Sequence, residues 1–176
     1  ICARTKEDID GAAAKLSSYG VKVIALACDI TTESGKEKLL EACDSPDILI
    51  NNAGGPPPGI WSDWSRTDFI NAIDANMLTP IELIKKVLPT MIKNKWGRIV
   101  NITSQAVKAP VPALGLSNSA RTGLTGYVAG TSRQVARFGV NINNLLPGMH
   151  DTKRLIDLDT ALSKEKNISY EEARNS

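Results

Sequence analysis

Apolar residues follow two different spacings along this chain, and each spacing predicts a different kind of element. Runs of apolar and β-branched residues predict buried strands, whereas apolar positions three and four residues apart predict helices that bury one face. Strands are predicted at residues 21–30, 47–50, 98–103 and 140–146, with a strand end at residues 1–4. Helices are predicted at residues 7–19, 32–43, 65–88 with a helical end to 95, 113–137 and 155–166.

This alternation of strands and helices predicts the fold class. The expected architecture is α/β, a Rossmann-like doubly wound parallel sheet in a three-layer α/β/α arrangement. With no internal repeat and no linker, residues 1–176 are predicted to form a single dinucleotide-binding domain. Because residues 1–4 resemble the end of a strand, we expect the chain to be a fragment, truncated at both ends.

The composition is that of an ordinary soluble domain, with 42% hydrophobic and 23% charged residues and a formal net charge of +2. This charge is small and scattered, which argues against nucleic acid and membrane partners. The three cysteines, Cys2, Cys28 and Cys43, lack Cys-x-x-Cys spacing. They are expected to be reduced and structural, which predicts a cytoplasmic protein and no metal site.

Small or polar residues follow each predicted strand. They are Arg4, Asp29, the Asn51–Gly54 turn, Ser104 and the Pro147–Thr152 turn. In doubly wound sheets ligands bind beyond the carboxyl ends of the strands, so together these residues predict a nucleotide-sized groove. Each residue also has a structural interpretation, because Asp29 suits a helix cap and paired asparagines suit a turn.

Two polar residues of the long predicted helix complete the candidate site. Ser117 and Arg121 are four residues apart and therefore lie on one face of that helix. We expect both to face a pocket at the strand end that carries Ser104. The chain contains five short motifs, which are Cys28–Ile30, Asn51–Gly54, Gly97–Ser104, Ser117–Arg121 and Pro147–Gly148. In their order and spacing they resemble the motifs of the short-chain dehydrogenase/reductase family. The similarity is greatest to its 3-oxoacyl-[acyl-carrier-protein] reductase-like members.

The resemblance implies a nicotinamide-dependent oxidoreductase that interconverts a small-molecule carbonyl and alcohol, as a homodimer or homotetramer when intact. It also implies roles for individual residues. The catalytic residues would be Ser104, which orients the carbonyl, Asn76, which holds a relay water, and Ser117 and Arg121 in place of the usual tyrosine and lysine. The cofactor-binding residues would be Arg4, Asp29, Ile30, Asn52, Ala53, Gly54, Arg121, Pro147, Gly148 and Thr152.

The chain departs from this family in two ways. The glycine-rich pyrophosphate loop is absent, so we expect the first strand-helix unit to be missing from this sequence. Serine at position 117 is far less acidic than a phenol and reaches roughly 4 Å less far. Loss of a positioned general acid typically costs about 10²–10⁴ in rate. Arginine at position 121 suits ribose binding, although its permanent charge makes it a poor proton relay.

Several further residues carry alternative interpretations. His150 is either a replacement acid or a partly exposed loop residue. Tyr127 is turned roughly 280° from Ser117 around the helix, which favours core packing. Arg4 follows a strand without a neighbouring acid and so favours NADP(H) over NAD(H), through the 2′-phosphate. Trp61 and Trp64 either border the substrate mouth or anchor their loop.

A stripe of three glycines, Gly123, Gly126 and Gly130, lies along the long helix. Each glycine costs about 1 kcal/mol relative to alanine, so another backbone is expected to approach closely. That backbone belongs either to the same chain or to a second copy. The leading function is an NADP-dependent carbonyl reductase similar to 3-oxoacyl-thioester reductases. The rivals are a dinucleotide-binding sensor or oligomer partner without turnover, and a lyase or epimerase on the same scaffold.

Overall fold

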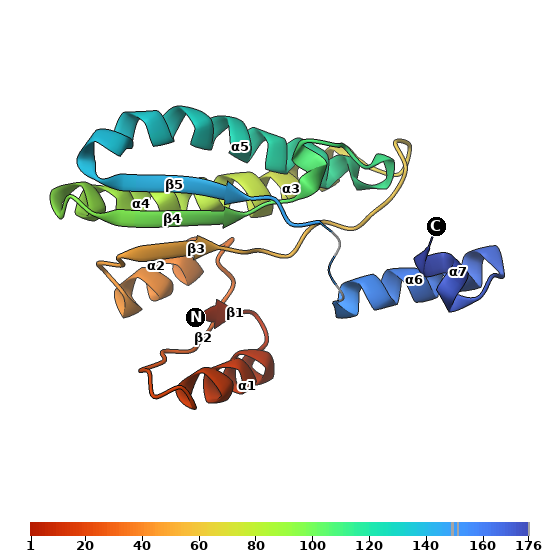
Figure 1. The fold of residues 1–176 in the computed structure, drawn as a ribbon, viewed down its shortest axis with the longest axis horizontal. Helices are drawn as coiled ribbons and strands as arrows, with labels where there is room; N and C mark the ends of the chain where they lie inside the picture. Colours follow the sequence, from red (N-terminus) through yellow and green to blue (C-terminus); the bar gives the residue numbers. More distant parts are fainter. Residues whose placement is uncertain (149, 151, 176) are drawn as a thin grey trace. The chain divides into compact units, whose positions relative to one another are not determined.

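The computed structural model of the chain describes residues 1–148, 150 and 152–175. They form two compact units, Ile1–Leu146 and Pro147–Ser176. In the first unit the strands, drawn as arrows in Figure 1, are β1 (Cys2–Ala3), β2 (Leu26–Ala27), β3 (Ile48–Asn51), β4 (Gly97–Ile102) and β5 (Val140–Leu145). Its α-helices are α1 (Lys6–Ser17), α2 (Glu33–Ala42), α3 (Arg66–Ile73), α4 (Thr79–Lys93) and α5 (Gly115–Val135). The second unit contains α6 (Lys153–Lys166) and α7 (Tyr170–Arg174).

All strand pairs are parallel, as predicted, but they form two sheets instead of one continuous sheet. β1 pairs with β2, and β4 lies between β3 and β5. The alternation of these strands with helices confirms the α/β class. In the larger sheet Asn51, Asn101 and Asn144 lie opposite one another, so the carboxyl ends of β3, β4 and β5 meet at one edge.

One face of the larger sheet is covered by α4 and α5. Its core side chains come from α4, β4, α5 and β5, and they are Ile84, Val87, Leu88, Met91, Ile99, Leu124, Val128, Val135, Val140 and Ile142. Tyr127 packs against this cluster, in agreement with the core interpretation. The opposite face of the sheet leaves Ile48, Ile50 and Leu145 more than half exposed in the first unit.

The long helix predicted over residues 65–88 is divided by a π-helix, Asp74–Leu78. Ser65 caps α3, and its side chain and that of Asp68 form a capping box. The helix predicted over residues 65–88 is thus interrupted just before Pro80, where the backbone widens at the π-helix. This widening places Asn76 at the sheet edge, as π-helices often do at functional sites.

The strand predicted over residues 21–30 is shorter than expected and forms only at Leu26–Ala27. Val21 and Ile24 are 56% and 43% exposed, so their apolar character does not reflect burial in a sheet centre. β2 pairs only with the two residues of β1, which leaves the rest of the segment without a partner strand. The prediction of a long buried strand here was wrong.

The three glycines of α5 have different surroundings. A Cβ on Gly123 would lie 2.4 Å from the sulfur of Met77 in the π-helix, so packing within the chain explains this glycine. A Cβ on Gly126 or Gly130 would meet no atom of the described chain within 4 Å. Close packing within the chain therefore accounts for one glycine of the stripe and not for the other two.

We expect Gly126→Ala to raise the free energy of unfolding of the isolated chain by about 1 kcal/mol, because alanine has the higher helix propensity and space is open. Gly123→Ala is the matched comparison and should stabilise the chain less than Gly126→Ala, because its methyl group requires the sulfur end of the Met77 side chain to move. Urea denaturation at low protein concentration measures both. A Gly123→Ala variant more stable than Gly126→Ala would contradict the packing described for this helix.

Candidate functional site

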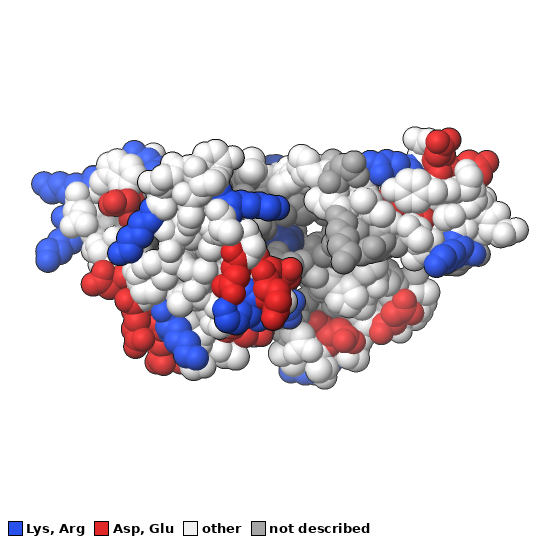
Figure 2. Space-filling view, turned by 90° about the horizontal axis from the view of Figure 1, so that it is seen from below, with Lys and Arg blue, Asp and Glu red and all other residues white. Residues whose placement is uncertain are grey.

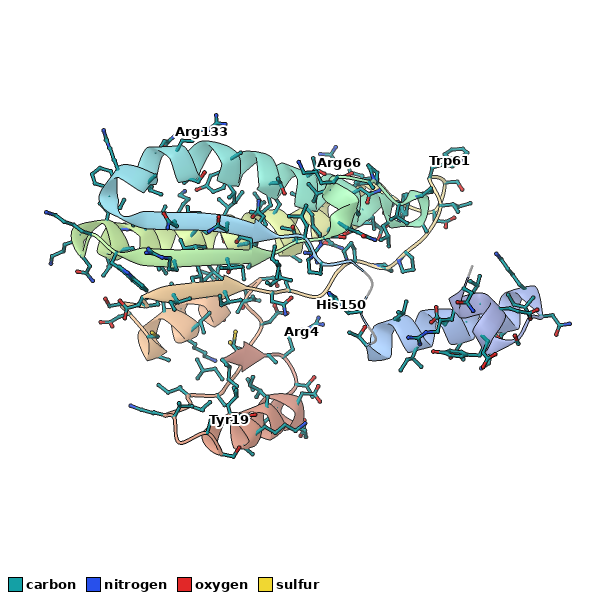
Figure 3. The ribbon with its side chains drawn as sticks, viewed as in Figure 1. Arg4, Tyr19, Trp61, Arg66, Arg133 and His150 are labelled. Atoms are coloured by element: carbon teal, nitrogen blue, oxygen red, sulfur yellow. The ribbon has the colours of Figure 1, made fainter. Side chains whose placement is uncertain are left out.

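A groove of about 690 Å³ runs along the carboxyl ends of β1, β2 and β3. It brings together most of the residues predicted to bind a cofactor. Among its lining residues are Arg4, Asp29, Ile30, Asn52, Ala53, Gly54 and Asn76. Arg4 lies at the end of β1, as Figure 3 shows. The volume of the groove is within the range of small-molecule and cofactor sites, roughly 300–1,000 Å³.

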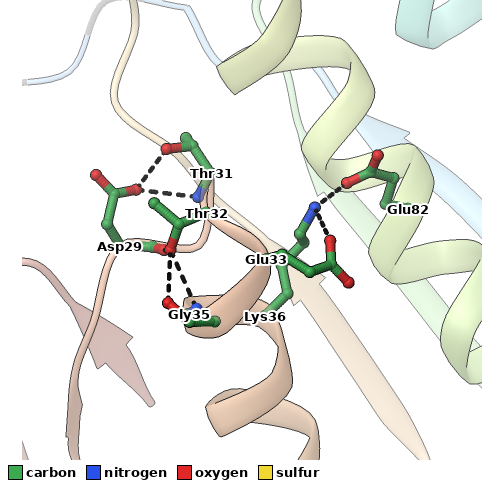
Figure 4. Close-up of polar contacts among 8 residues, drawn as sticks. Asp29, Thr31, Thr32, Glu33, Gly35, Lys36 and Glu82 are labelled. Atoms are coloured by element: carbon green, nitrogen blue, oxygen red, sulfur yellow. Dashed lines mark hydrogen bonds and ion pairs between the residues drawn. The ribbon is translucent and has the colours of Figure 1, made fainter.

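The carboxylate of Asp29 is oriented by the start of α2 (Figure 4). It accepts hydrogen bonds from the backbone N–H of Thr31 at 3.0 Å and from the Thr31 hydroxyl at 2.8 Å. These two bonds lower the pKa of Asp29, with the backbone bond as the larger cause. Thr32 forms the N-cap of α2 and donates its hydroxyl to the Asp29 carbonyl at 2.8 Å. Asp29 is thus an ionised, fixed acceptor on the groove wall, and its capping and binding interpretations both remain compatible with this geometry.

A smaller cavity of about 20 Å³ lies beside the groove, with room for about one water molecule. Asn76, Thr79 and Arg121 are among its lining residues. Asn76 is 5% and Thr79 1% exposed, and the Asn76 Oδ1 and Thr79 Oγ1 atoms have no hydrogen-bond partner in the described chain. Buried polar atoms normally find partners. These two unpartnered oxygen atoms therefore suit the water-holding role predicted for Asn76, which stays a prediction.

Arg121 fastens the ends of two strands together. Its Nη1 donates to the carbonyl oxygens of Ile102 at 2.8 Å and Thr103 at 3.1 Å, and its Nη2 donates to that of Ala53 at 3.3 Å. The guanidinium thus joins the segment after β4 to the segment after β3. Ribose binding by Arg121 stays a prediction, and the structure adds a role in holding the groove wall that the sequence did not indicate.

A row of amide side chains crosses the larger sheet just below this edge. The amide of Asn51 donates to Oδ1 of Asn101 at 2.8 Å, and the amide of Asn101 donates to Oδ1 of Asn144 at 3.0 Å. Asn101 is only 1% exposed. Asn51 was predicted to be part of a turn, and its hydrogen bond to Asn101 in this row was not predicted. The available signal was an asparagine near the end of each of three predicted strands.

The two candidate serines lie on different elements, with Ser104 just after β4 and Ser117 in the first turn of α5. Ser104 is half-buried, and its Oγ accepts the backbone N–H of Ala106 at 3.1 Å, which leaves the hydroxyl proton for donation. Ser117 is 7% exposed. Neither serine lines the groove or the small cavity, so their predicted shared pocket with Arg121 stays a prediction.

The loop between β3 and α3 is anchored by Trp64. Added Cβ atoms on Gly59 and Gly115 would lie 2.9 Å and 2.3 Å from its indole, and its ring meets Phe69 edge-on. Both glycines are therefore needed for the indole to fit. Trp61 is 87% exposed (Figure 3), so the anchoring interpretation holds for Trp64 only.

The remaining predicted residues belong to the second unit. They are Pro147, Gly148, His150 and Thr152, of which Thr152 is the N-cap of α6. Residues 149 and 151 of the predicted Pro147–Thr152 turn lie outside the described residues. His150 is exposed. The roles predicted for these four residues, including His150 as a replacement acid, stay predictions.

Charge and hydropathy add little to this site. On the face drawn in Figure 2, basic side chains are separated by acidic and uncharged ones. Among the described residues, no helix has the length and apolar content needed to cross a bilayer. Within the same residues, no group of three or more His, Cys, Asp or Glu side chains is placed to hold a metal ion.

Comparison with known proteins adds the family context. Residues 1–162 match the short chain dehydrogenase family. An uncharacterized oxidoreductase of Bacillus subtilis is 31% identical, with 94% of this chain and 66% of that protein covered. The ketoacyl reductase HetN of Nostoc is 29% identical (86% and 54% covered), and the acetoacetyl-CoA reductase of Cupriavidus necator is 32% identical (67% and 48% covered). The chain thus spans about half to two thirds of the length of these relatives.

Solved structures agree with this match. An actinorhodin polyketide ketoreductase variant with NADPH has a TM-score of 0.86 and 26% identity, and the match covers 98% of this chain and 68% of that one. The sorbitol-6-phosphate 2-dehydrogenase of Erwinia amylovora has a TM-score of 0.84 at 20% identity, covering 98% and 70%. The second likeness concerns the fold alone.

Proposed function

Because the chain belongs to the short chain dehydrogenase family, we propose that it forms the core of an NADP-dependent oxidoreductase. Its substrate class would be a small carbonyl compound, such as a 3-oxoacyl thioester, reduced to the alcohol. The observation that carries this proposal is the groove at the strand ends, where Arg4, Asp29 and the Asn52–Gly54 turn meet. The ketoacyl and acetoacetyl-CoA reductases among the relatives support the substrate class.

The residues of the groove fit a dinucleotide in size and chemistry. Asp29 offers a fixed carboxylate acceptor for hydroxyl or amino groups, and Arg4 at the end of β1 offers a cation for a 2′-phosphate. The NADPH in the related ketoreductase supports the choice of NADP over NAD. When bound, the cofactor would supply the hydride.

The chain's own residues would do the rest. Ser104 would donate its hydroxyl proton in a hydrogen bond to the carbonyl oxygen, because its Oγ already accepts from Ala106. Asn76 would hold a water in the small polar cavity beside the groove. Ser117, or another group not yet identified, would pass the proton to the alkoxide oxygen.

A second candidate function is dinucleotide binding without turnover, as a sensor or oligomer partner. It is favoured by Arg121, whose guanidinium holds three backbone carbonyls, and by Ser117, which has no acidic phenol. A second copy packed against α5 would account for Gly126 and Gly130, whose exposed sides meet no atom within 4 Å among the described residues. We therefore also propose that the intact protein is a homodimer or homotetramer.

The discriminating experiment measures NADPH and NADH binding and oxidation by the full-length protein with a panel of ketones and 3-oxoacyl thioesters. We expect tighter binding of NADPH and slow oxidation that depends on substrate. Ser117→Tyr, assayed alongside, tests whether a phenol restores a faster rate. Tight NADPH binding without turnover on any substrate would favour the binding protein. No binding of either dinucleotide would contradict both functions.

A further inference from the structure

The two buried residues of α2, Gly35 and Lys36, face different neighbours. Gly35 packs against the loop before the helix, where an added Cβ would lie 1.9 Å from the carbonyl oxygen of Asp29. Its backbone N–H also donates to the Thr32 hydroxyl at 3.1 Å. The close approach and the capping bonds make the start of α2 and the Asp29–Thr31 segment one rigid piece.

Lys36 connects this piece to a distant helix. Its ammonium donates to Glu82 on α4, 46 residues away in sequence, and pairs with Glu33 at 3.0 Å (Figure 4). The Lys36 side chain is 9% exposed, whereas that of Glu82 is 47% exposed. The pKa of Lys36 is raised, chiefly by the hydrogen bond to Glu82, so the ammonium stays charged. Leu40 of α2 packs at the edge of the core, and the bond from Lys36 to Glu82 adds a polar contact between α2 and α4.

The two helices that Lys36 joins each carry one wall of the dinucleotide groove. The residues before α2, Asp29–Thr31, line one wall. The π-helix directly before α4 contributes Ala75 and Asn76 to another. Lys36 itself is not among the lining residues of the groove. The bond between Lys36 and Glu82 therefore sets how far apart the two walls lie without touching a ligand.

We infer that Lys36 is a positioning residue for dinucleotide binding, which holds the Asp29 wall in register with the Asn76 wall through Glu82. This inference rests on the proposed function. The Glu82 side chain is about half exposed, and ion pairs screened by solvent contribute little to the stability of a fold. Its effect is therefore expected in the alignment of the two walls more than in the stability of the fold. A ligand that spans both walls depends on that alignment, whereas a ligand on one wall does not.

The test compares Lys36→Met with Lys38→Met, which removes an exposed lysine from the same helix. The full-length protein is titrated with whichever of NADPH and NADH binds the wild type more tightly, and with the adenosine half alone, 2′,5′-ADP or ADP. In Lys36→Met we expect a dinucleotide Kd raised about tenfold and a half-ligand Kd changed less than twofold. Lys36→Arg should restore most of the affinity, and Lys38→Met should bind both ligands as the wild type does.

Wild-type dinucleotide affinity in Lys36→Met would overturn the inference and leave the proposed function intact. Equal weakening of both ligands, together with a lower Tm, would also overturn it, because that pattern indicates general destabilisation. A wild-type protein that binds no dinucleotide would instead overturn the proposed function on which the inference rests.

Discussion

Ser104→Ala is expected to lower kcat for carbonyl reduction by about 10²–10³-fold, the typical effect of removing one hydrogen bond to a developing oxyanion. Ser104 follows β4 at the edge of the sheet where the groove lies. Its Oγ accepts the backbone N–H of Ala106, so the hydroxyl proton points away from that bond. Alanine removes the donor that we assign to the substrate carbonyl. Steady-state kinetics with the best ketone or thioester of the panel measure the change.

Two controls separate this chemical role from the local structural one. Ser104→Thr keeps a hydroxyl that can both accept from Ala106 and donate to the substrate, and it should retain most of the activity. Ser119→Ala removes an exposed hydroxyl that bonds only within α5, and should leave kcat unchanged. An unchanged kcat in Ser104→Ala would remove Ser104 from the mechanism. If dinucleotide affinity fell and kcat did not, Ser104 would act as the N-cap of the short 3-10 helix Gln105–Val107 and not in the chemistry.

Much of the fold was predictable because it depends on local spacing and capping. The alternation of apolar runs and helical spacing predicted parallel strands joined by helices. Thr32 caps α2 at the predicted start of that helix, and Gly139 ends the long helical segment with a φ of 77°. At Gly139 a side chain would also meet the carbonyl oxygen of Lys95, so only glycine suits this turn.

Two of the errors depend on partners that are distant in the sequence, and the third depends on a local change of backbone bonding. The segment 21–30 is apolar enough for a buried strand, yet only Leu26 and Ala27 find a partner in β1. The π-helix at Asp74–Leu78 requires a change from i+4 to i+5 bonding, which apolar spacing does not reveal. The row from Asn51 to Asn144 depends on strand register, and register is not visible in one strand at a time.

Of the candidate site, the sequence predicted the residues but not their partners. The rule that ligands bind at strand ends selected the groove residues Arg4, Asp29 and Gly54. The sequence did not reveal that Lys36 bonds to Glu82, because a lysine on a helix is ordinarily solvated. Arg121 was predicted to replace the catalytic lysine and to bind ribose. Its bonds to backbone carbonyls were not predicted, because a helix face shows direction and not what the side chain reaches.

The reach of Arg121 leads to the largest expected effect on stability. Arg121→Met should lower the free energy of unfolding by about 3 kcal/mol, because hydrogen bonds from charged donors and carbonyls left without donors each count for about 1–3 kcal/mol. The carbonyls affected lie at the end of β4, at Ile102 and Thr103, and after β3, at Ala53. Since Ala53 also lines the groove, dinucleotide affinity should fall together with stability. Urea denaturation followed by circular dichroism measures the first effect, and fluorescence titration the second.

Arg121→Lys is the more informative variant, because it restores the family's residue while removing the planar fork. An ammonium reaches fewer of the three carbonyls at once, so we expect a free energy of unfolding between that of the wild type and that of Arg121→Met. Arg133→Met, an exposed arginine on the same helix (Figure 3), should change stability by less than about 0.5 kcal/mol. If Arg121→Lys proved as stable as the wild type, the three backbone bonds would not matter to the fold. The arginine would then have to be explained by ligand binding alone.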